Sequence, residues 1–327
     1  MKVLVTGGSG FLGSAICVQL VSRGDEVIAF QRGTSDRLEQ LGARIIRGSI
    51  TDAEAIASAM QSVDAVIHTA AKAGIWGPYD EYYQPNVAGT ENVIAGCRQN
   101  GISKLVFTSS PSVVHGGGDI EGGDESLPYP DHFNSPYPAT KALAEQLVMA
   151  ANDSELRTVS LRPHLIWGPG DNHLLPHLLE RTKSGKLKLP GPDKLIDMVY
   201  IDNVADAHLL ALDKLASDPQ MVGGKTYFIT NDEPLSQGEL IGRLLKAAGR
   251  DVEITAISPP IAMAAGIIFE NAWKLFRLKS EPPITRWSAE HLSTAHWFDI
   301  SAAKRDLGYA VRISVAEGLR RLSAILS

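Results

Sequence analysis

The chain has 327 residues, of which 44% are hydrophobic, and a formal net charge of −6. This length and composition can bury a large core, and the 31 Lys and Arg residues form no basic block, so we exclude an electrostatic nucleic-acid binder. The two cysteines, Cys17 and Cys97, exclude a disulfide framework and suit a reducing cytoplasm. The first residues, MKVLVTGG, do not resemble a signal peptide, so we predict a cytoplasmic protein.

Short apolar segments alternate with longer helical patterns along the first half of the chain. This alternation predicts an α/β fold in which a doubly wound parallel sheet of the Rossmann type carries helices on both faces. The expected strands are 2–6, 26–30, 44–48, 64–69, 104–110 and 157–162, with the sheet resuming at 196–202 and 226–230. We assign residues 1–165 and 195–234 to a dinucleotide-binding domain. Residues 166–194 and 235–327 would then form a second, smaller substrate lobe.

The stretch TGGSGFLG follows the first expected strand and opens the first expected helix. Gly7 and Gly8 permit a sharp turn, Gly10 lets the backbone approach a pyrophosphate, and Gly13 lets the helix pack closely. The free N–H groups and the dipole of the helix N-terminus favour a bound diphosphate. The stretch therefore predicts a dinucleotide site, although a tight strand-to-helix turn alone could use the same glycines.

The second expected strand ends in VIAFQRG, where an NAD-binding site would place an acidic residue. Gln31 occupies that position and Arg32 follows it. No carboxylate repels a ribose 2′-phosphate there, and a guanidinium is available to pair with it, so we expect NADP(H) to be favoured over NAD(H). The alternative is that Arg32 is an ordinary solvated surface residue.

The stretch SPYPATKALAEQLV places Tyr137 and Lys141 four residues apart, on one face of an expected helix. A nearby ammonium favours the phenolate, which would make Tyr137 a usable proton donor or acceptor for a carbonyl or alcohol oxygen. Ser110 lies at the carboxyl end of a parallel strand, where ligands of such sheets bind. Without Ser110, an exposed Tyr–Lys pair would be the simpler interpretation.

The stretches TGGSGFLG, FTSSPSVV, YPATK, LRPHLIWGPGD and VYIDNVADAHLLAL resemble the extended short-chain dehydrogenase/reductase family, and within it the 3β-hydroxysteroid dehydrogenase-like branch. The resemblance covers almost the whole chain. It implies that Ser110 orients the substrate oxygen, that Tyr137 transfers the proton, and that Lys141 lowers the tyrosine pKa and binds the nicotinamide ribose. It further implies that Asn86 supports a proton path.

Four other stretches, AAKAGIWGPYDEYYQPNVAGTENV, GPGDNHLLPHLLERTKSGKL, YFITNDEPL and EPPITRWSAEHLSTAHWFDIS, resemble the bacterial 2-alkyl-3-oxoalkanoate reductases of long-chain olefin biosynthesis. This resemblance implies reduction of a β-keto acid with NADPH. The cofactor contacts that we expect come from Gly7, Gly10, Phe11, Leu12, Gly13, Gln31, Arg32, Ala70, Lys72, Tyr137, Lys141 and Pro163. The partner hypotheses are a homodimer and, by resemblance, an assembly with other enzymes of the olefin pathway.

Three positions differ from the family pattern or stay open. Gly48 is followed by Ser49 where the family has an acid near the adenine, which puts that contact in doubt. Val114, His115 and Gly116 replace the usual Tyr-Gly, so the role of that loop is open. Lys72 could reach the cofactor or be a plain surface lysine.

Other candidates have simple structural interpretations. His173 and His177 have the spacing of a metal pair, but no neighbouring ligand completes a set, so we expect no metal. His115, His164 and Trp167 either line the substrate pocket or have structural roles. The stretch 261–279 is a packed helix or a lid over an apolar substrate, and its apolar part is too short to span a membrane.

Three classes of function are consistent with these residues. A redox enzyme acting on a large apolar substrate is favoured, either a long-chain keto acid or a steroid. A sugar-nucleotide epimerase or dehydratase would use the same Tyr and Lys and would need cations such as Arg181, Lys183, Lys186 and Lys188. A non-catalytic cofactor-sensing protein would have no need for Ser110, Tyr137 and Lys141 together.

Overall fold

The computed structural model describes residues 1–278 and 280–326. Its centre is a seven-stranded sheet with the strand order β12-β7-β5-β4-β1-β2-β3, and every neighbouring pair is parallel. The strands are β1 (Lys2–Thr6), β2 (Glu26–Gln31), β3 (Arg44–Arg47), β4 (Ala65–His68), β5 (Lys104–Thr108), β7 (Arg157–Pro163) and β12 (Lys225–Ile229). The order reverses between β1 and β4, and the crevice beyond their carboxyl ends is where such sheets bind ligands.

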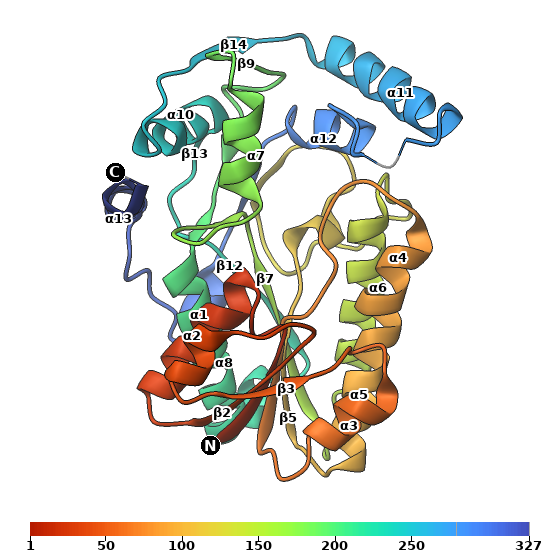
Figure 1. Ribbon diagram of the computed structural model, residues 1–327, viewed down its shortest axis with the longest axis vertical. Helices are drawn as coiled ribbons and strands as arrows, with labels where there is room; N and C mark the ends of the chain where they lie inside the picture. The colour runs from red at the N-terminus through yellow and green to blue at the C-terminus, as the bar shows by residue number, and fades with distance from the viewer. Residues whose placement is uncertain (279, 327) are drawn as a thin grey trace.

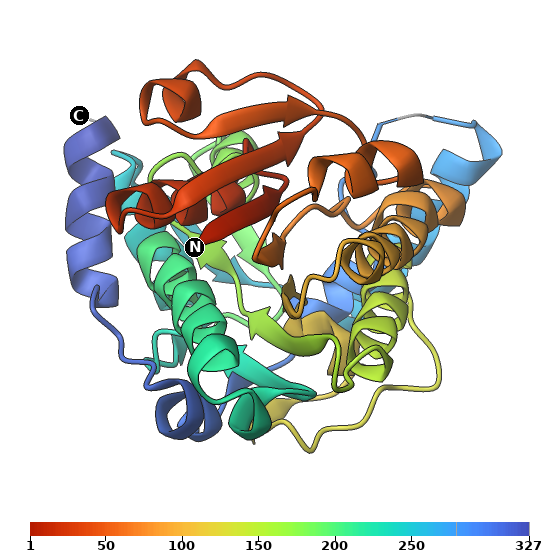
Figure 2. The same ribbon diagram turned by 90° about the horizontal axis from the view of Figure 1, so that it is seen from below.

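Helices cover both faces of this sheet (Figure 2). The helices α1 (Phe11–Ser22) and α8 (Ile201–Ser217) pack together on one face, and α3 (Ala53–Ala59), α5 (Gly89–Gln99) and α6 (Pro136–Ala150) cover the other. Along β1, Val3 and Val5 belong to the core on the first face and Leu4 to the core on the second. The strands are apolar at consecutive positions because both of their faces are buried. The predicted α/β doubly wound fold is therefore confirmed.

Short elements connect the main ones. They are α2 (Asp36–Gln40), α4 (Tyr79–Tyr83), α9 (Pro219–Val222), the π-helical turns Gln84–Ala88 and Ala303–Leu307, and the 3-10 turn Pro111–Val114. The turn Pro111–Val114 follows β5 directly, and the turn Gln84–Ala88 joins α4 to α5. Both lie near the carboxyl edge of the sheet, where we describe the site below.

A second group of elements lies beyond the carboxyl edge of the central sheet (Figure 1). It contains a four-stranded sheet of β13 (Leu235–Ser236), β10 (Leu195–Ile196), β15 (His296–Phe298) and β6 (Ile120–Gly123), and the pairs β8 (Ile166–Trp167) with β11 (Val199–Tyr200) and β9 (Lys186–Leu189) with β14 (Glu253–Ala256). Its helices are α7 (Leu174–Arg181), α10 (Gln237–Ala247), α11 (Pro259–Leu275) and α12 (Arg286–His291), and α13 (Val315–Leu326) ends the chain beside α10. Because β6 pairs with β15, residues from both assigned domains share the small sheet, and the domain boundaries stay a prediction.

The expected return of the central sheet at 196–202 is wrong. Residues 199–200 pair only with β8, Ile196 pairs with His296 and Leu235, and α8 begins at Ile201. The stretch is apolar because the lobe and α8 bury it, and Asp197 inside it accepts a hydrogen bond from the backbone N–H of Phe298. Burial in this segment therefore comes from the lobe and not from a central strand.

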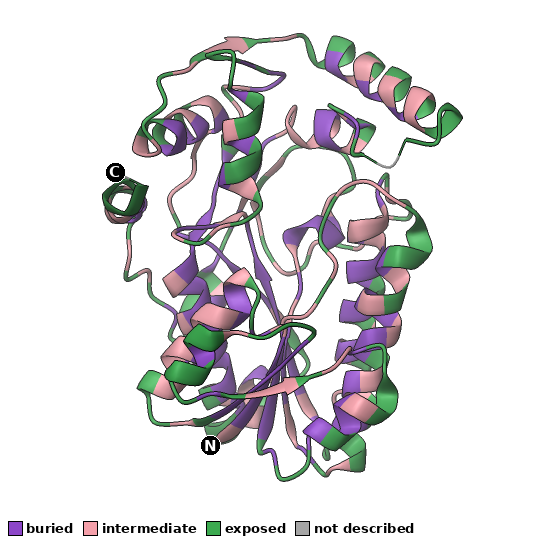
Figure 3. Ribbon diagram, in the orientation of Figure 1, coloured by how far each residue is buried: buried purple, intermediate pink, exposed green. Residues whose placement is uncertain are grey.

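Helix α11 packs on α12 along one side and forms no wall of the cavities described below. It buries Ala262, Gly266 and Glu270, while Ile268 and Leu275 are exposed. Figure 3 shows most of this helix as exposed or half-buried. The α11 side chains line none of the three cavities described below. Position 279, at the end of the stretch considered from the sequence, lies outside the described residues. Within residues 1–278 and 280–326, no helix has the length and apolarity needed to cross a bilayer.

Candidate active site

The turn between β1 and α1 is built so tightly that only glycine fits. Gly7 has a positive φ of 70°, and a Cβ at Gly13 would lie 2.2 Å from the carbonyl oxygen of Gly7. No side chain caps the start of α1 at Gly10, so the first N–H groups of the helix are free for a ligand. These groups face a cavity of about 690 Å³ that Gly7, Gly10 and Gly13 line. The arrangement can hold a diphosphate.

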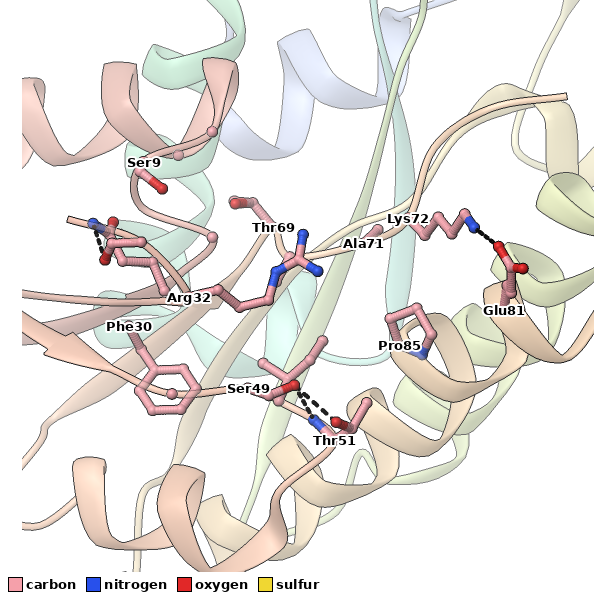
Figure 4. A pocket seen from close by; sticks show the side chains of 18 residues that line it. Ser9, Phe30, Arg32, Ser49, Thr51, Thr69, Ala71, Lys72, Glu81 and Pro85 are labelled. Atoms are coloured by element: carbon pink, nitrogen blue, oxygen red, sulfur yellow. Dashed lines mark hydrogen bonds and ion pairs between the residues drawn. The ribbon is translucent and has the colours of Figure 1, made fainter. Parts of the chain in front are cut away.

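The far end of the same cavity is formed where β2 and β3 end (Figure 4). Gln31 is the last residue of β2, and its buried Oε1 has no hydrogen-bond partner. Arg32 extends into the cavity and makes no hydrogen bond or ion pair with the described residues. Ser49, which stands in place of the expected acid, lines the cavity and bonds to the Thr51 hydroxyl at 2.8 Å. Glu81 is the one carboxylate among the described residues of the cavity lining, and it pairs with Lys72 and not with Arg32.

Ser110, Tyr137 and Lys141 line a second cavity, of about 400 Å³, at the end of β5. Ser110 is positioned as the N-cap of the 3-10 turn, accepting a hydrogen bond from the backbone N–H of Ser112. Tyr137 lies in the first turn of α6, and Lys141 follows one turn later and donates a 2.7 Å hydrogen bond to the carbonyl oxygen of Thr108. The structure therefore brings together the three residues that the sequence singled out.

Burial controls the charge of this group. It raises the pKa of the Tyr137 phenol above its usual value, although a hydrogen bond with Ser110 acts in the opposite direction. It also lowers the pKa of Lys141 from 10.5 to about 7, against the attraction of Glu145. Burial is the larger of these two effects on Tyr137, so in the free protein at neutral pH the phenol keeps its proton. Such a phenol can donate a proton to a carbonyl oxygen.

Glu145 lies one turn beyond Lys141 and is fully buried. Its carboxylate pairs with Arg162 at 2.6 Å and accepts hydrogen bonds from Tyr129 at 2.7 Å and Ser160 at 2.8 Å. These partners hold the pKa of Glu145 below its usual value in spite of burial. The network keeps a negative charge under Lys141 and joins α6 rigidly to β7.

Asn86 does not line the cavities, because its amide is fully used behind them. It lies in the π-helical turn, accepts a hydrogen bond from the backbone N–H of Lys72 at 2.7 Å, and donates to the Lys72 carbonyl and the Thr140 hydroxyl, each at 3.0 Å. It thereby connects the loop after β4 to α6.

The remaining predicted cofactor contacts divide between the two cavities. Ala70 and Lys72 line the first, and Phe11, Leu12 and Pro163 line the second. The Lys72 ammonium forms an ion pair with Glu81 at the surface, so it is not free.

A third cavity, of about 430 Å³, opens from the second into the lobe and is largely apolar. The two cavities share Ala73, Leu165, Ile166, His173, Trp287, His291 and His296. The other walls of the apolar cavity come from α7, β9, β10 and α10. They include Leu174, Leu178, Leu187, Leu189, Ile196, Leu240 and Leu244. Of the two alternatives for the stretch around α11, a packed helix or a lid, the structure agrees with the packed helix, because α11 packs on α12 and lines no part of this cavity. The apolar residues at helical spacing in α7 and α10 were the sequence signal that could have indicated these walls.

Two of the three other pocket candidates lie at the site. His115 and His164 line the second cavity, whereas Trp167 is buried against Tyr200 with ring centroids 5.3 Å apart and lines none of the three cavities. His177 and Arg181 line the apolar cavity. The sequence reasoning missed His291 and His296, which lie late in the chain with no motif to mark them.

Comparison with known proteins identifies the family. The sequence profile of the 3-beta hydroxysteroid dehydrogenase/isomerase family matches residues 4–257. The chain belongs to this family. Relatives include a 2-alkyl-3-oxoalkanoate reductase of Stenotrophomonas maltophilia, 51% identical over 99% of both chains, and one of Shewanella oneidensis, 46% identical over 98% of this chain and 85% of the relative.

A solved structure of similar fold is the UDP-glucose 4-epimerase of Thermus thermophilus in complex with NAD. It has a TM-score of 0.75 and 25% sequence identity, covering 100% of this chain and 98% of that one. Together with the family, this likeness makes the protein an NAD(P)-dependent oxidoreductase of the extended short-chain dehydrogenase/reductase type, which acts on CH–OH groups. The predicted family and enzyme class are confirmed.

Proposed function

We propose that the protein reduces the ketone of a long-chain 2-alkyl-3-keto acid to the 3-hydroxy acid with NADPH. The observation that carries this proposal is the apolar cavity that adjoins Tyr137 and extends into the lobe. Burying an alkyl chain there contributes about 25 cal/mol per Å² of apolar surface, whereas a sugar nucleotide would leave polar groups unsatisfied against the same leucines. The names of the two reductases above support the same substrate class.

The residues of the first cavity fit a dinucleotide phosphorylated on its ribose. The glycine turn leaves room for a diphosphate against the free N–H groups of α1, and the unpaired Arg32 guanidinium is available for a 2′-phosphate. Lys141 and Tyr137 would hold the nicotinamide ribose. When bound, NADPH supplies the hydride that the carbonyl carbon receives.

The residues of the second cavity would supply the proton and hold the ketone. Ser110 and Tyr137 would both donate hydrogen bonds to the carbonyl oxygen, and Tyr137 would release its proton to that oxygen as the alcohol forms. Lys141, held by the Thr108 carbonyl, would stabilise the phenolate that remains. We propose that Asn86 acts as a positioning residue that holds the loop after β4 against α6. This placement would support the proton path by which Tyr137 is reprotonated.

The decisive experiment follows NADPH absorbance with a panel of substrates. We expect turnover of 2-alkyl-3-keto acids to exceed that of 3-ketosteroids and of UDP-sugars. Preferred turnover of a ketosteroid would instead identify the substrate as a steroid of the kind named in the family description. Conversion of a UDP-sugar without net NADPH consumption would instead establish an epimerase and overturn the proposal.

The cellular location is proposed from the two cysteines. Both cysteines are buried and free, which suits the reducing cytoplasm that we propose. A homodimer and an assembly with other olefin-pathway enzymes stay predictions.

A further inference from the structure

The two cavities at the substrate side contain most of the histidines of the chain. Of its nine histidines, six line these cavities: His115, His164, His173, His177, His291 and His296. The cavity that contains Tyr137 has no arginine in its lining, and Lys141 is its one lysine. An anionic group of the substrate near Tyr137 would therefore have to be received mainly by imidazoles.

Three aromatic rings form a stack at the boundary of the two cavities. Trp287 stacks on His291 with centroids 4.7 Å apart, and His291 stacks on His296 at 3.9 Å, both with an angle of 14° between planes. Nε2 of His296 donates to the backbone carbonyl of His291 at 3.0 Å. The Nδ1 atoms of His291 and His296 are buried and have no hydrogen-bond partner in the described structure. Buried polar atoms of this kind call for a partner that the protein itself does not provide.

His164 completes the group from the other side, beyond the end of β7. Its Nδ1 donates to the Oδ1 of Asp197 at 2.6 Å, and Asp197 is itself buried and held by the N–H of Phe298. Because the carboxylate takes Nδ1–H, the opposite ring nitrogen is left for the cavity that His164 lines. One ring nitrogen each of His164, His291 and His296 lies within 4.8 Å of the other two.

We infer that His164, His291 and His296 form the binding site for the carboxylate of the substrate. The inference rests on the proposed function and names the group that the site recognises. In a 3-keto acid the carboxylate is two carbons from the ketone, so a ketone held by Tyr137 brings the carboxylate into the same cavity. Nδ1 of His291 has no partner and can donate to the carboxylate. The N–H groups of neutral His164 and His296 already donate to Asp197 and to the His291 carbonyl, so their remaining nitrogens are acceptors and the carboxylate must bind together with a proton.

The groups around His291 and His296 make the protonation of these rings depend on a bound anion. Burial lowers the pKa of His291 and of His296, and the neighbouring His115 and His164 lower it further. In the empty cavity these rings are therefore neutral. A bound carboxylate supplies the missing negative charge, and the face of Trp287 over His291 favours an imidazolium.

The test compares an acid with its neutral methyl ester. Oxidation of a 2-alkyl-3-hydroxy acid with NADP⁺ avoids the unstable keto acid as a starting compound: Tyr137 first loses its proton to solvent, hydride leaves C3 for the nicotinamide, and the hydroxyl proton goes to the Tyr137 phenolate. We expect wild-type kcat/KM for the acid to exceed that for the ester by about tenfold or more, the size of a charge-assisted hydrogen bond. Equal efficiencies would remove the carboxylate site while keeping the dehydrogenase. No turnover of either compound would reject the proposed substrate class, and the carboxylate site with it.

Two variants locate the site. His291→Phe keeps a ring on Trp287 without the ring nitrogens, and Asp197→Asn removes the charge behind His164. Each should lower the acid-to-ester ratio by about tenfold, whereas a fault in folding would lower both efficiencies together. His132→Phe, at an exposed position outside the cavities, is the matched control. An unchanged ratio in both variants would overturn the inference.

The same three imidazoles are also a set that a transition metal could bind. The stacked rings of His291 and His296 argue against it, because parallel rings 3.9 Å apart do not aim their nitrogens at one ion. Calorimetric titration of the enzyme with Zn²⁺ decides this point. Stoichiometric binding that His291→Phe abolishes, combined with an acid-to-ester ratio near one, would establish a metal site instead.

Discussion

The Lys141 ammonium donates a 2.7 Å hydrogen bond to the carbonyl oxygen of Thr108, in a site where the lysine is fully buried. This bond fixes the ammonium at the end of β5, one helical turn from Tyr137. It also places a charge where water cannot solvate it, which explains why its pKa falls to about 7. The placement has consequences for stability as well as for catalysis.

Lys141 should make the stability of the cofactor-free protein depend on pH. Its pKa is about 7 in the folded protein and about 10.4 in an unfolded chain. Between these values the unfolded chain binds more protons, so the free energy of unfolding rises with pH, by up to about 1.4 kcal/mol per pH unit. In Lys141→Met this contribution should vanish. Urea unfolding at pH 7.5 and 9 measures it, with Lys246→Met as an exposed control, and an identical rise in Lys141→Met would contradict the burial argument.

Tyr137→Phe should retain the fold and NADPH affinity but lose turnover by about 10²- to 10⁴-fold, because only the phenolic oxygen is removed from proton transfer. Steady-state kinetics and a fluorescence titration of NADPH separate the two effects. Tyr79→Phe changes an exposed tyrosine in the same way and should leave both unchanged. Near-normal turnover in Tyr137→Phe would mean that another group supplies the proton.

Arg32→Ala should weaken NADPH binding by about tenfold or more and change NADH binding little. The reason is the loss of a charge-assisted hydrogen bond of about 1.5 to 3 kcal/mol to the 2′-phosphate. Dissociation constants for both cofactors measure the preference. Arg37→Ala, on α2 and outside the cavities, is the control. If the preference survives in Arg32→Ala, the guanidinium has no part in selecting the cofactor.

Catalytic efficiency should increase with alkyl length by a factor of several for each methylene, or about tenfold or more for each pair, until the apolar cavity is full, since each buried CH₂ contributes about 0.8 kcal/mol. Leu178→Phe, which places a larger side chain in that cavity, should move the optimum to shorter chains. Ile268→Ser, on the exposed face of α11, should leave the optimum in place. A flat dependence on length would remove the cavity as the chain-binding site.

The sequence predicted the half of the site that depends on local rules. The glycine turn, the end of β2 at Gln31 and the Tyr137–Lys141 spacing are set within a few residues, and parallel strands bring their carboxyl ends to one edge. His291 and His296 could not be found this way. They reach the site because β15 pairs with β10 at Ile196 and His296, a contact of one residue pair between segments 100 residues apart.

Helix α11 shows a second limit of sequence reasoning. Its composition indicates how much apolar surface it carries but not which element covers it, and in the structure Ile261, Ile268 and Leu275 stay exposed. The prediction of a central strand at 196–202 was wrong for a related reason. Consecutive apolar residues indicate burial on all sides, which a lobe and a helix can provide as well as a sheet can.

The tight turn before α1 limits how the cofactor preference could be re-engineered. A Cβ at Gly13 would meet the Gly7 carbonyl at 2.2 Å, and one at Gly8 would lie 2.6 Å from the Cβ of Ala29. A library that varies these glycines would therefore consist mostly of misfolded proteins. Arg32 and Ser49 instead lie in the cavity lining beyond the ends of β2 and β3, so the freedom to design a new nucleotide specificity is confined to the rim opposite the turn.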